Sequence, residues 1–186
     1  MPRYGRLIIA LTGGPGSGKT TLARDLAVRL NGKAAGFGDY VRHLVSEEEA
    51  KVDRAILQQV GQKLAEADPV SFLDGFLAWA NFDPDRSAII EGVRHAVVDT
   101  ALRDWARKCN KRYILIALNA SIEERARRRC DGNVDGLLEI DAHNVERDVR
   151  AALPSRADLI ANGDEKISQI IQEIQIKLGL EIPDES

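Results

Sequence analysis

Short apolar runs alternate with longer stretches of helical periodicity along most of the chain. The runs predict five strands, at residues 6–11, 34–37, 87–91, 112–118 and 158–161. Apolar residues spaced by three or four positions predict helices over 19–30, 41–67, 69–80, 97–108, 122–129, 142–152 and 165–178. The unbroken run at 112–118 suits a buried parallel strand. Strands joined by crossover helices predict an α/β fold with three α/β/α layers around a five-stranded parallel sheet.

Glycine and polar residues follow the end of each predicted strand. They stand at 13–20, 38–39, 91–94, 119 and 162–163. Because open parallel sheets bind ligands at the carboxyl ends of their strands, these segments predict one site along a single edge of the sheet.

The first of these segments, GGPGSGKT at residues 13–20, matches the phosphate-binding pattern G-x-x-x-x-G-K-[ST] between a strand and a helix. Glycines leave room for backbone N–H groups to point at phosphate oxygens, and the following helix adds its dipole. Lys19 supplies a positive charge and the Thr20 hydroxyl a magnesium ligand. A glycine-rich connector with an incidental lysine would not explain this spacing. We therefore expect ATP and Mg²⁺ as cofactors, with the nucleotide bound by Gly13, Gly14, Pro15, Gly16, Ser17, Gly18, Lys19, Thr20 and Thr21.

Two acidic residues follow predicted strands. Glu91 ends a buried apolar run, where an unpaired carboxylate is costly, so we expect it to contact magnesium or the loop lysine. Asp39 could orient or deprotonate an acceptor as a catalytic group. It could equally be the N-cap of the helix that begins near Val41, which is a common use of aspartate.

Arginines form two further groups of candidates. Arg42 and Arg94 follow the second and third strands, where their planar forks of donors could bind an acceptor phosphate. Surface salt bridges are the alternative. Arg125 and Arg129 are one helical turn apart, which favours a joint catalytic contact with phosphate, although such a basic run is ordinarily a solvated face.

Length and composition indicate one domain spanning residues 1–186. The net charge of −3 implies no general affinity for nucleic acid. Cys109 and Cys130 have no metal-site spacing and suit reduced thiols in the cytoplasm, the expected location. The first apolar run is too short for a signal peptide or a membrane span, so we expect no membrane partner.

Over nearly its whole length the chain resembles the small P-loop kinases of the nucleoside monophosphate kinase and dephospho-CoA kinase group. The phosphate-binding loop carries most of the resemblance, and weaker motifs follow in the right order at 38–42, 89–94, 124–129 and 157–163. The resemblance implies that Arg42 and Arg94 grip the acceptor, that Thr20 and Glu91 hold magnesium, and that Asn162 lies beside the donor adenine. It also implies a helical lid at about 122–150, with Arg147 and Arg150 on its far side, in a monomer or small homo-oligomer.

The chain departs from adenylate kinases at three places. Glu91 replaces the usual aspartate, Val93 replaces a proline, and residues 47–80 lack the base-recognition sequence. We therefore expect transfer of the ATP γ-phosphoryl group to a small phosphate acceptor, first a nucleoside monophosphate. A hydroxyl acceptor such as dephospho-CoA or a nucleoside, with Asp39 as base, is an alternative. An ATPase or a nucleotide-sensing regulator is another, because the loop alone does not identify the reaction.

Overall fold

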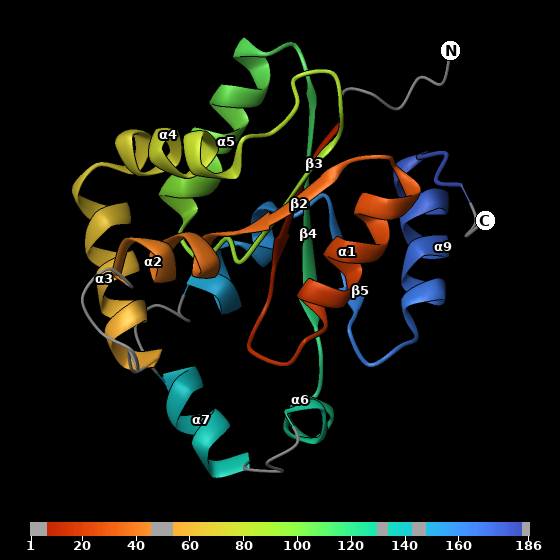
Figure 1. Ribbon diagram of the computed structural model, residues 1–186. Coiled ribbons are helices and arrows are strands. Elements are labelled where there is room, and N and C mark those ends of the chain that lie inside the picture. Colours follow the sequence, from red (N-terminus) through yellow and green to blue (C-terminus); the bar gives the residue numbers. More distant parts are fainter. Residues whose placement is uncertain (1–6, 46–53, 130–133, 143–147, 184–186) are drawn as a thin grey trace.

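The sheet of this computed structural model has the expected parallel arrangement. The structure describes residues 7–45, 54–129, 134–142 and 148–183. The strands are β1 (Leu7–Thr12), β2 (Lys33–Gly36), β3 (Ala88–Glu91), β4 (Arg112–Asn119) and β5 (Leu159–Asn162). They form one sheet of five strands in the order β2-β3-β1-β4-β5, and each neighbouring pair is parallel (Figure 1). The central strand β1 therefore delivers the phosphate-binding loop to the middle of the carboxyl edge.

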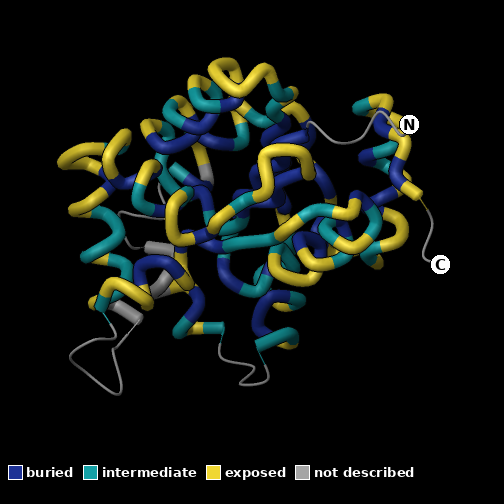
Figure 2. The backbone as a smooth tube through the Cα atoms, turned by 45° about the horizontal axis from the view of Figure 1, so that its top comes forward, coloured by how far each residue is buried: buried dark blue, intermediate teal, exposed yellow. Residues whose placement is uncertain are grey.

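Helices cover both faces of the sheet, which confirms the expected three layers. One face carries α1 (Lys19–Arg29) and α9 (Ile167–Leu178), and the other carries α2 (Phe37–Val45), α3 (Arg54–Ala67), α4 (Pro69–Ala80) and α5 (Ala96–Lys108) (Figure 1). Successive residues of a strand point to opposite faces, so Ile8 joins the core on the α5 side and Ile9 joins the core beneath α1. Figure 2 shows the buried residues gathered toward the centre of the molecule, and β1 is buried along its whole length.

Local capping explains the helix whose bounds agree with the prediction. Asp68 precedes α4, and its carboxylate accepts hydrogen bonds from the backbone N–H groups of Val70 and Ser71. Pro69 occupies the first helical position, where no N–H is needed. Asn81 ends the helix in the left-handed conformation, with φ of 47°.

The segment after β2 corrects the sequence-based expectation. Phe37, expected in a strand, begins α2, because its ring stacks on Phe72 and Phe76 at centroid distances of 5.3 and 4.1 Å. The helix expected over 41–67 is described as α2 and α3, and residues 46–53 lie outside the described chain.

The expected lid region also differs from prediction. α6 (Ile122–Arg128) is present, but α7 (Val134–Ala142) occupies a stretch in which 131–136 was expected to be a loop. Gly136 lowers helix propensity there, while its neighbour Leu137 is buried. Of the helix expected over 142–152, residues 143–147 lie outside the described chain, and the described end is a π-helical turn, η1 (Asp148–Ala152), followed by the short 3₁₀ helix η2 (Pro154–Arg156).

None of the helices in the described part of the chain has the length and apolarity that crossing a membrane requires.

Gly75 in α4 tests the packing of the aromatic cluster against α2. A Cβ on Gly75 would collide with the hydroxyl group of Tyr40, which is buried. We expect Gly75→Ala to lower the free energy of unfolding by about 1–3 kcal/mol, because overpacking forces a shift. Urea denaturation would measure it. Adding Tyr40→Phe should restore most of the loss, and a double variant as unstable as the single one would contradict this explanation.

Candidate active site

The loop after β1 has a backbone that only glycine tolerates at three positions. Gly13, Gly16 and Gly18 have φ of 143°, 78° and 95°. A Cβ on Gly13 would lie 2.5 Å from the carbonyl oxygen of Leu118, and one on Gly16 would lie 2.7 Å from that of Arg125. The same glycines that free the backbone N–H groups therefore let β4 and α6 approach the loop.

Lys19 folds back across this loop. Its Nζ donates to the carbonyl oxygen of Gly14 at 2.7 Å and to Ser17 Oγ at 3.3 Å. The residue before α1 is Gly18, which has no side chain to cap the helix, so the first-turn N–H groups face the position of a bound anion. Thr20 and Thr21 are exposed on that turn.

Three side chains from different elements converge beside the loop. Thr20 Oγ1 donates to Glu91 Oε2 at 2.7 Å. A Cβ placed on Gly36 would lie 3.3 Å from Glu91 Oε1 and 3.5 Å from Asp39 Oδ2, so the two carboxylates flank one point at the end of β2. Hydroxyl and carboxylate oxygens suit Mg²⁺, which usually keeps several waters and substrate oxygens. These are the groups of the chain that would hold that ion.

Asp39 is not the N-cap of α2. The helix begins at Phe37, so Asp39 lies inside its first turn. Its Oδ1 instead accepts from Arg42 Nη1 at 2.6 Å. The capping alternative is therefore wrong, and a catalytic role stays a prediction.

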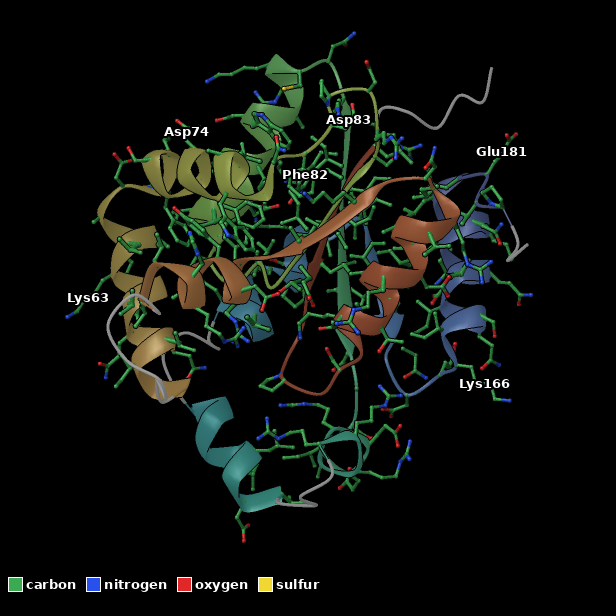
Figure 3. All side chains as sticks on the ribbon, in the orientation of Figure 1. Lys63, Asp74, Phe82, Asp83, Lys166 and Glu181 are labelled. Carbon is green, nitrogen blue, oxygen red and sulfur yellow. The ribbon has the colours of Figure 1, made fainter. Side chains whose placement is uncertain are left out.

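A cavity of about 420 Å³ opens between α2, α3 and the start of α5. It contains both arginines expected to bind the acceptor, Arg42 and Arg94. Its other lining residues are Phe37, Gly38, Val41, Leu57, Gln58, Gly61, Gln62, Phe72, Gly92, His95 and Val98. α3 has one face toward this cavity and one face toward the outside. Gln58 and Gln62 line the cavity, whereas Lys63 points away from it to the outside (Figure 3).

His95, which lines this cavity, has a shifted pKa. Burial lowers the pKa of His95, while the charges of Asp148 and Glu66 oppose this effect and that of Arg94 adds to it. The imidazole therefore favours its neutral form, which can accept a hydrogen bond from a ligand.

Arg125 already contacts the phosphate-binding loop. Its side chain is 8% exposed and its Nε donates to the carbonyl oxygen of Pro15 at 2.8 Å. Burial lowers the pKa of Arg125. Figure 3 shows the side chains of α6 reaching toward the loop. Arg125 belongs to the segment in which the resemblance implies a lid, and in this structure its guanidinium already packs against Gly14 and Pro15.

Arg128 was not assigned a site role from sequence, yet it also reaches the loop. Its Nη1 donates to the carbonyl oxygen of Gly163 at 2.7 Å and lies 3.3 Å from a Cβ placed on Gly18. Its three-residue spacing from Arg125 was the available signal. Arg128 Nε also donates to Glu124 Oε1 at 2.7 Å. Hydrogen bonding from Arg127 lowers the pKa of Glu124 to about 2.

The remaining candidates are Arg129, Asn162, Arg147 and Arg150. Arg129 is half-buried at the C-cap of α6. Asn162 forms the turn into α9, accepting from the Asp164 N–H at 3.1 Å, and it lines neither described cavity. Arg147 and the side chain of Arg150 lie outside the described part of the chain, as do parts of the expected lid.

A second cavity, of about 360 Å³, lies on the other side of the loop glycines. Gly13, Gly14 and Arg125 line it together with the ends of β4 and β5 and the segment around Val149 and Pro154. The phosphate-binding loop therefore lines this second cavity, while the first cavity, which contains Arg42 and Arg94, lies on the far side of Glu91 from the loop.

Comparison with known proteins agrees with this geometry. The family model described as an AAA domain matches residues 9–135, more than half of the chain. The chain belongs to this AAA-domain family. A UPF0200 protein of Aeropyrum pernix is 30% identical over 163 residues, which are 84% of this AAA-domain chain and 84% of that protein.

Two further similarities concern proteins with named activities. A dephospho-CoA kinase of Sodalis glossinidius is 28% identical over 145 residues, 76% of this chain and 68% of that enzyme. The shikimate kinase structure from Bacteroides thetaiotaomicron covers 94% of this chain and 99% of its own, with a TM-score of 0.58 and 20% identity. The latter concerns the fold alone. Together they confirm the expected small P-loop kinase, without naming its acceptor.

Removal of the loop lysine is the first test of the site. We expect Lys19→Ala to lower turnover by at least about a hundredfold, because it removes a positive charge from beside the charge that develops on the phosphate during transfer. The melting temperature should change little, since Lys19 is only half-buried. Coupled-enzyme measurement of ADP release would show the effect, and near-normal turnover would contradict the assignment.

Gly36→Ala tests whether the position of Glu91, with Asp39 beside it, matters for holding magnesium. The new Cβ would lie 3.1 Å from Glu91 Cγ and must displace that side chain or Asp39. We expect the Mg²⁺ concentration for half-maximal activity to rise about tenfold, the usual cost of misorienting a ligand. Lys33→Ala on the same strand is the control. An unchanged magnesium requirement in the glycine variant would contradict this role.

Proposed function

We propose that this chain transfers the γ-phosphoryl group of ATP to a hydroxyl group of a small anionic acceptor, with Asp39 as the general base. The observation that carries the proposal is the position of its carboxylate. It lies beside Glu91, which accepts a hydrogen bond from Thr20 of the loop segment, and it pairs with Arg42, which lines the cavity.

A carboxylate at this position suits a hydroxyl acceptor better than a phosphate acceptor. A hydroxyl group must lose its proton during transfer, so a nearby base accelerates the reaction. A phosphate is already anionic near neutral pH, and two acidic side chains beside its path would repel it. A nucleoside monophosphate, the first expectation from the motifs, is therefore the second candidate.

The cavity favours an acceptor with both an anionic and an apolar part. Arg42 and Arg94 supply charge, whereas Phe37, Val41 and Phe72 supply an apolar wall. Dephospho-CoA has this combination of anionic groups, free hydroxyl groups and a flat base, and a similar protein is named for acting on it. Shikimate, a small polar acid, would leave much of that wall uncovered.

The residues of the site would then have separate roles in the transfer reaction. The loop N–H groups, Lys19 and Arg125 would bind the triphosphate, and Thr20 with Glu91 would orient Mg²⁺. When bound, ATP and Mg²⁺ supply the transferable phosphoryl group and neutralise charge that develops during transfer. Asp39 would accept the proton of the acceptor hydroxyl. Arg42, whose Nη1 contacts Asp39, would align that carboxylate as well as the acceptor.

The test compares acceptors and removes the base. ATP consumption would be measured with dephospho-CoA, shikimate, nucleosides and nucleoside monophosphates. With a hydroxyl acceptor, Asp39→Asn should lower kcat by about 10²–10⁴-fold, since it keeps the shape but not the base. Asp74→Asn, on the exposed outer side of α4 (Figure 3), is the control.

Each outcome separates the alternatives. Phosphorylation of a nucleoside monophosphate that survives Asp39→Asn would overturn the hydroxyl assignment and favour the second candidate. Steady ATP hydrolysis that no acceptor changes would favour a nucleotide-sensing protein instead.

A further inference from the structure

The start of α5 is capped by a residue far along the chain. His95 is its N-cap residue, with extended backbone, and its side chain makes no capping hydrogen bond within the described structure. Asp148 takes over this function, because its Oδ2 accepts from the backbone N–H of Ala96 at 3.0 Å. A carboxylate at a helix N-terminus stabilises both the free N–H group and the helix dipole.

The capped turn adjoins the acceptor cavity. Arg94 and His95, which line that cavity, immediately precede Ala96. On their other side, the N–H groups of Gly92 and Val93 donate to the carbonyl oxygen of Leu11 at 3.1 and 3.2 Å. The cavity segment is therefore held between two anchors, one at the end of β1 and one at Asp148.

Asp148 is itself well placed to act as an anchor. It begins η1, whose Val149 is buried and packs in the core on this side of the sheet. Farther on, Arg156 Nε donates to Asp99 Oδ2 at 2.7 Å, and Asp99 lies fully buried on α5. The segment from Asp148 to Arg156 is thus held to α5 at two points.

We propose that Asp148 is a positioning residue for the acceptor cavity, which fixes the first turn of α5 and thereby Arg94 and His95. The inference rests on the proposed function insofar as that cavity receives the acceptor. Asp148 also acts on the His95 imidazole, whose pKa its negative charge raises against the effect of burial. Its loss should weaken binding of the acceptor more than binding of ATP, because Arg94 and His95 line the acceptor cavity, whereas the phosphate-binding loop keeps its own hydrogen bonds.

The experiment compares Asp148→Ala, Asp148→Asn and the control Asp104→Ala. Asp104 is a half-exposed carboxylate of α5 that pairs with Arg107 on the same helix. Hydrogen exchange without any ligand should become about fivefold to tenfold faster at residues 95–99 in Asp148→Ala, the usual effect of losing a helix cap. Asp148→Asn keeps an oxygen that can accept the hydrogen bond, so its exchange rates should lie between those of the wild type and of Asp148→Ala. Asp104→Ala should leave the exchange rates of these amides unchanged.

Kinetics supply the second readout. With dephospho-CoA as the acceptor probe, we expect Asp148→Ala to raise the KM for dephospho-CoA about fivefold to tenfold, with a clearly smaller rise of the KM for ATP. Unchanged exchange at 95–99, or an equal rise of both KM values, would overturn the proposal. If wild-type protein does not phosphorylate dephospho-CoA, that result counts against this acceptor, and the exchange measurement alone decides the role of Asp148.

Discussion

Glycine at the left-handed positions of the loop between β1 and α1 is the constraint on which the site depends. Side chains at Gly13 or Gly16 would strike backbone oxygens of β4 and α6, which no rotamer change can relieve. The loop therefore needs glycine twice over, for its own dihedral angles and for the close approach of its neighbours. Because α6 can dock so closely, Arg125 reaches the Pro15 carbonyl, and a basic side chain joins the donor site.

Sheet register explains how the acidic residues meet. Gly36 of β2 pairs with Glu91 of β3, and Glu91 pairs with Leu11 of β1. The three strands therefore end in one row, and the chain leaves each of them at the same edge. Asp39 follows β2 by a few residues and Thr20 lies in the first turn of α1, so both side chains flank Glu91. A shift of register by one residue would turn the Glu91 side chain to the other face of the sheet and separate it from Asp39 and Thr20.

Much of this arrangement could be predicted because it depends on local patterns in the sequence. The strands, the loop and the shared cavity of Arg42 and Arg94 follow from apolar runs, a spaced motif and the rule for carboxyl edges. Asp39 was ambiguous because the start of α2 depends on stacking of Phe37 against α4, which lies beyond the local sequence. The contact of Arg128 with Gly163 joins residues 35 positions apart, and no periodicity reveals it.

The two halves of the site are held by different kinds of contact. The donor half rests on glycine backbone geometry and short-range hydrogen bonds within the loop, so few substitutions there are tolerated. The acceptor half rests on side chains of α2 and α3 and on the hydrogen bond between Asp148 and Ala96. A fold built in this way could keep one phosphoryl donor while its acceptor changes, so the fold alone does not name the acceptor, which has to be argued from the chemistry around Asp39.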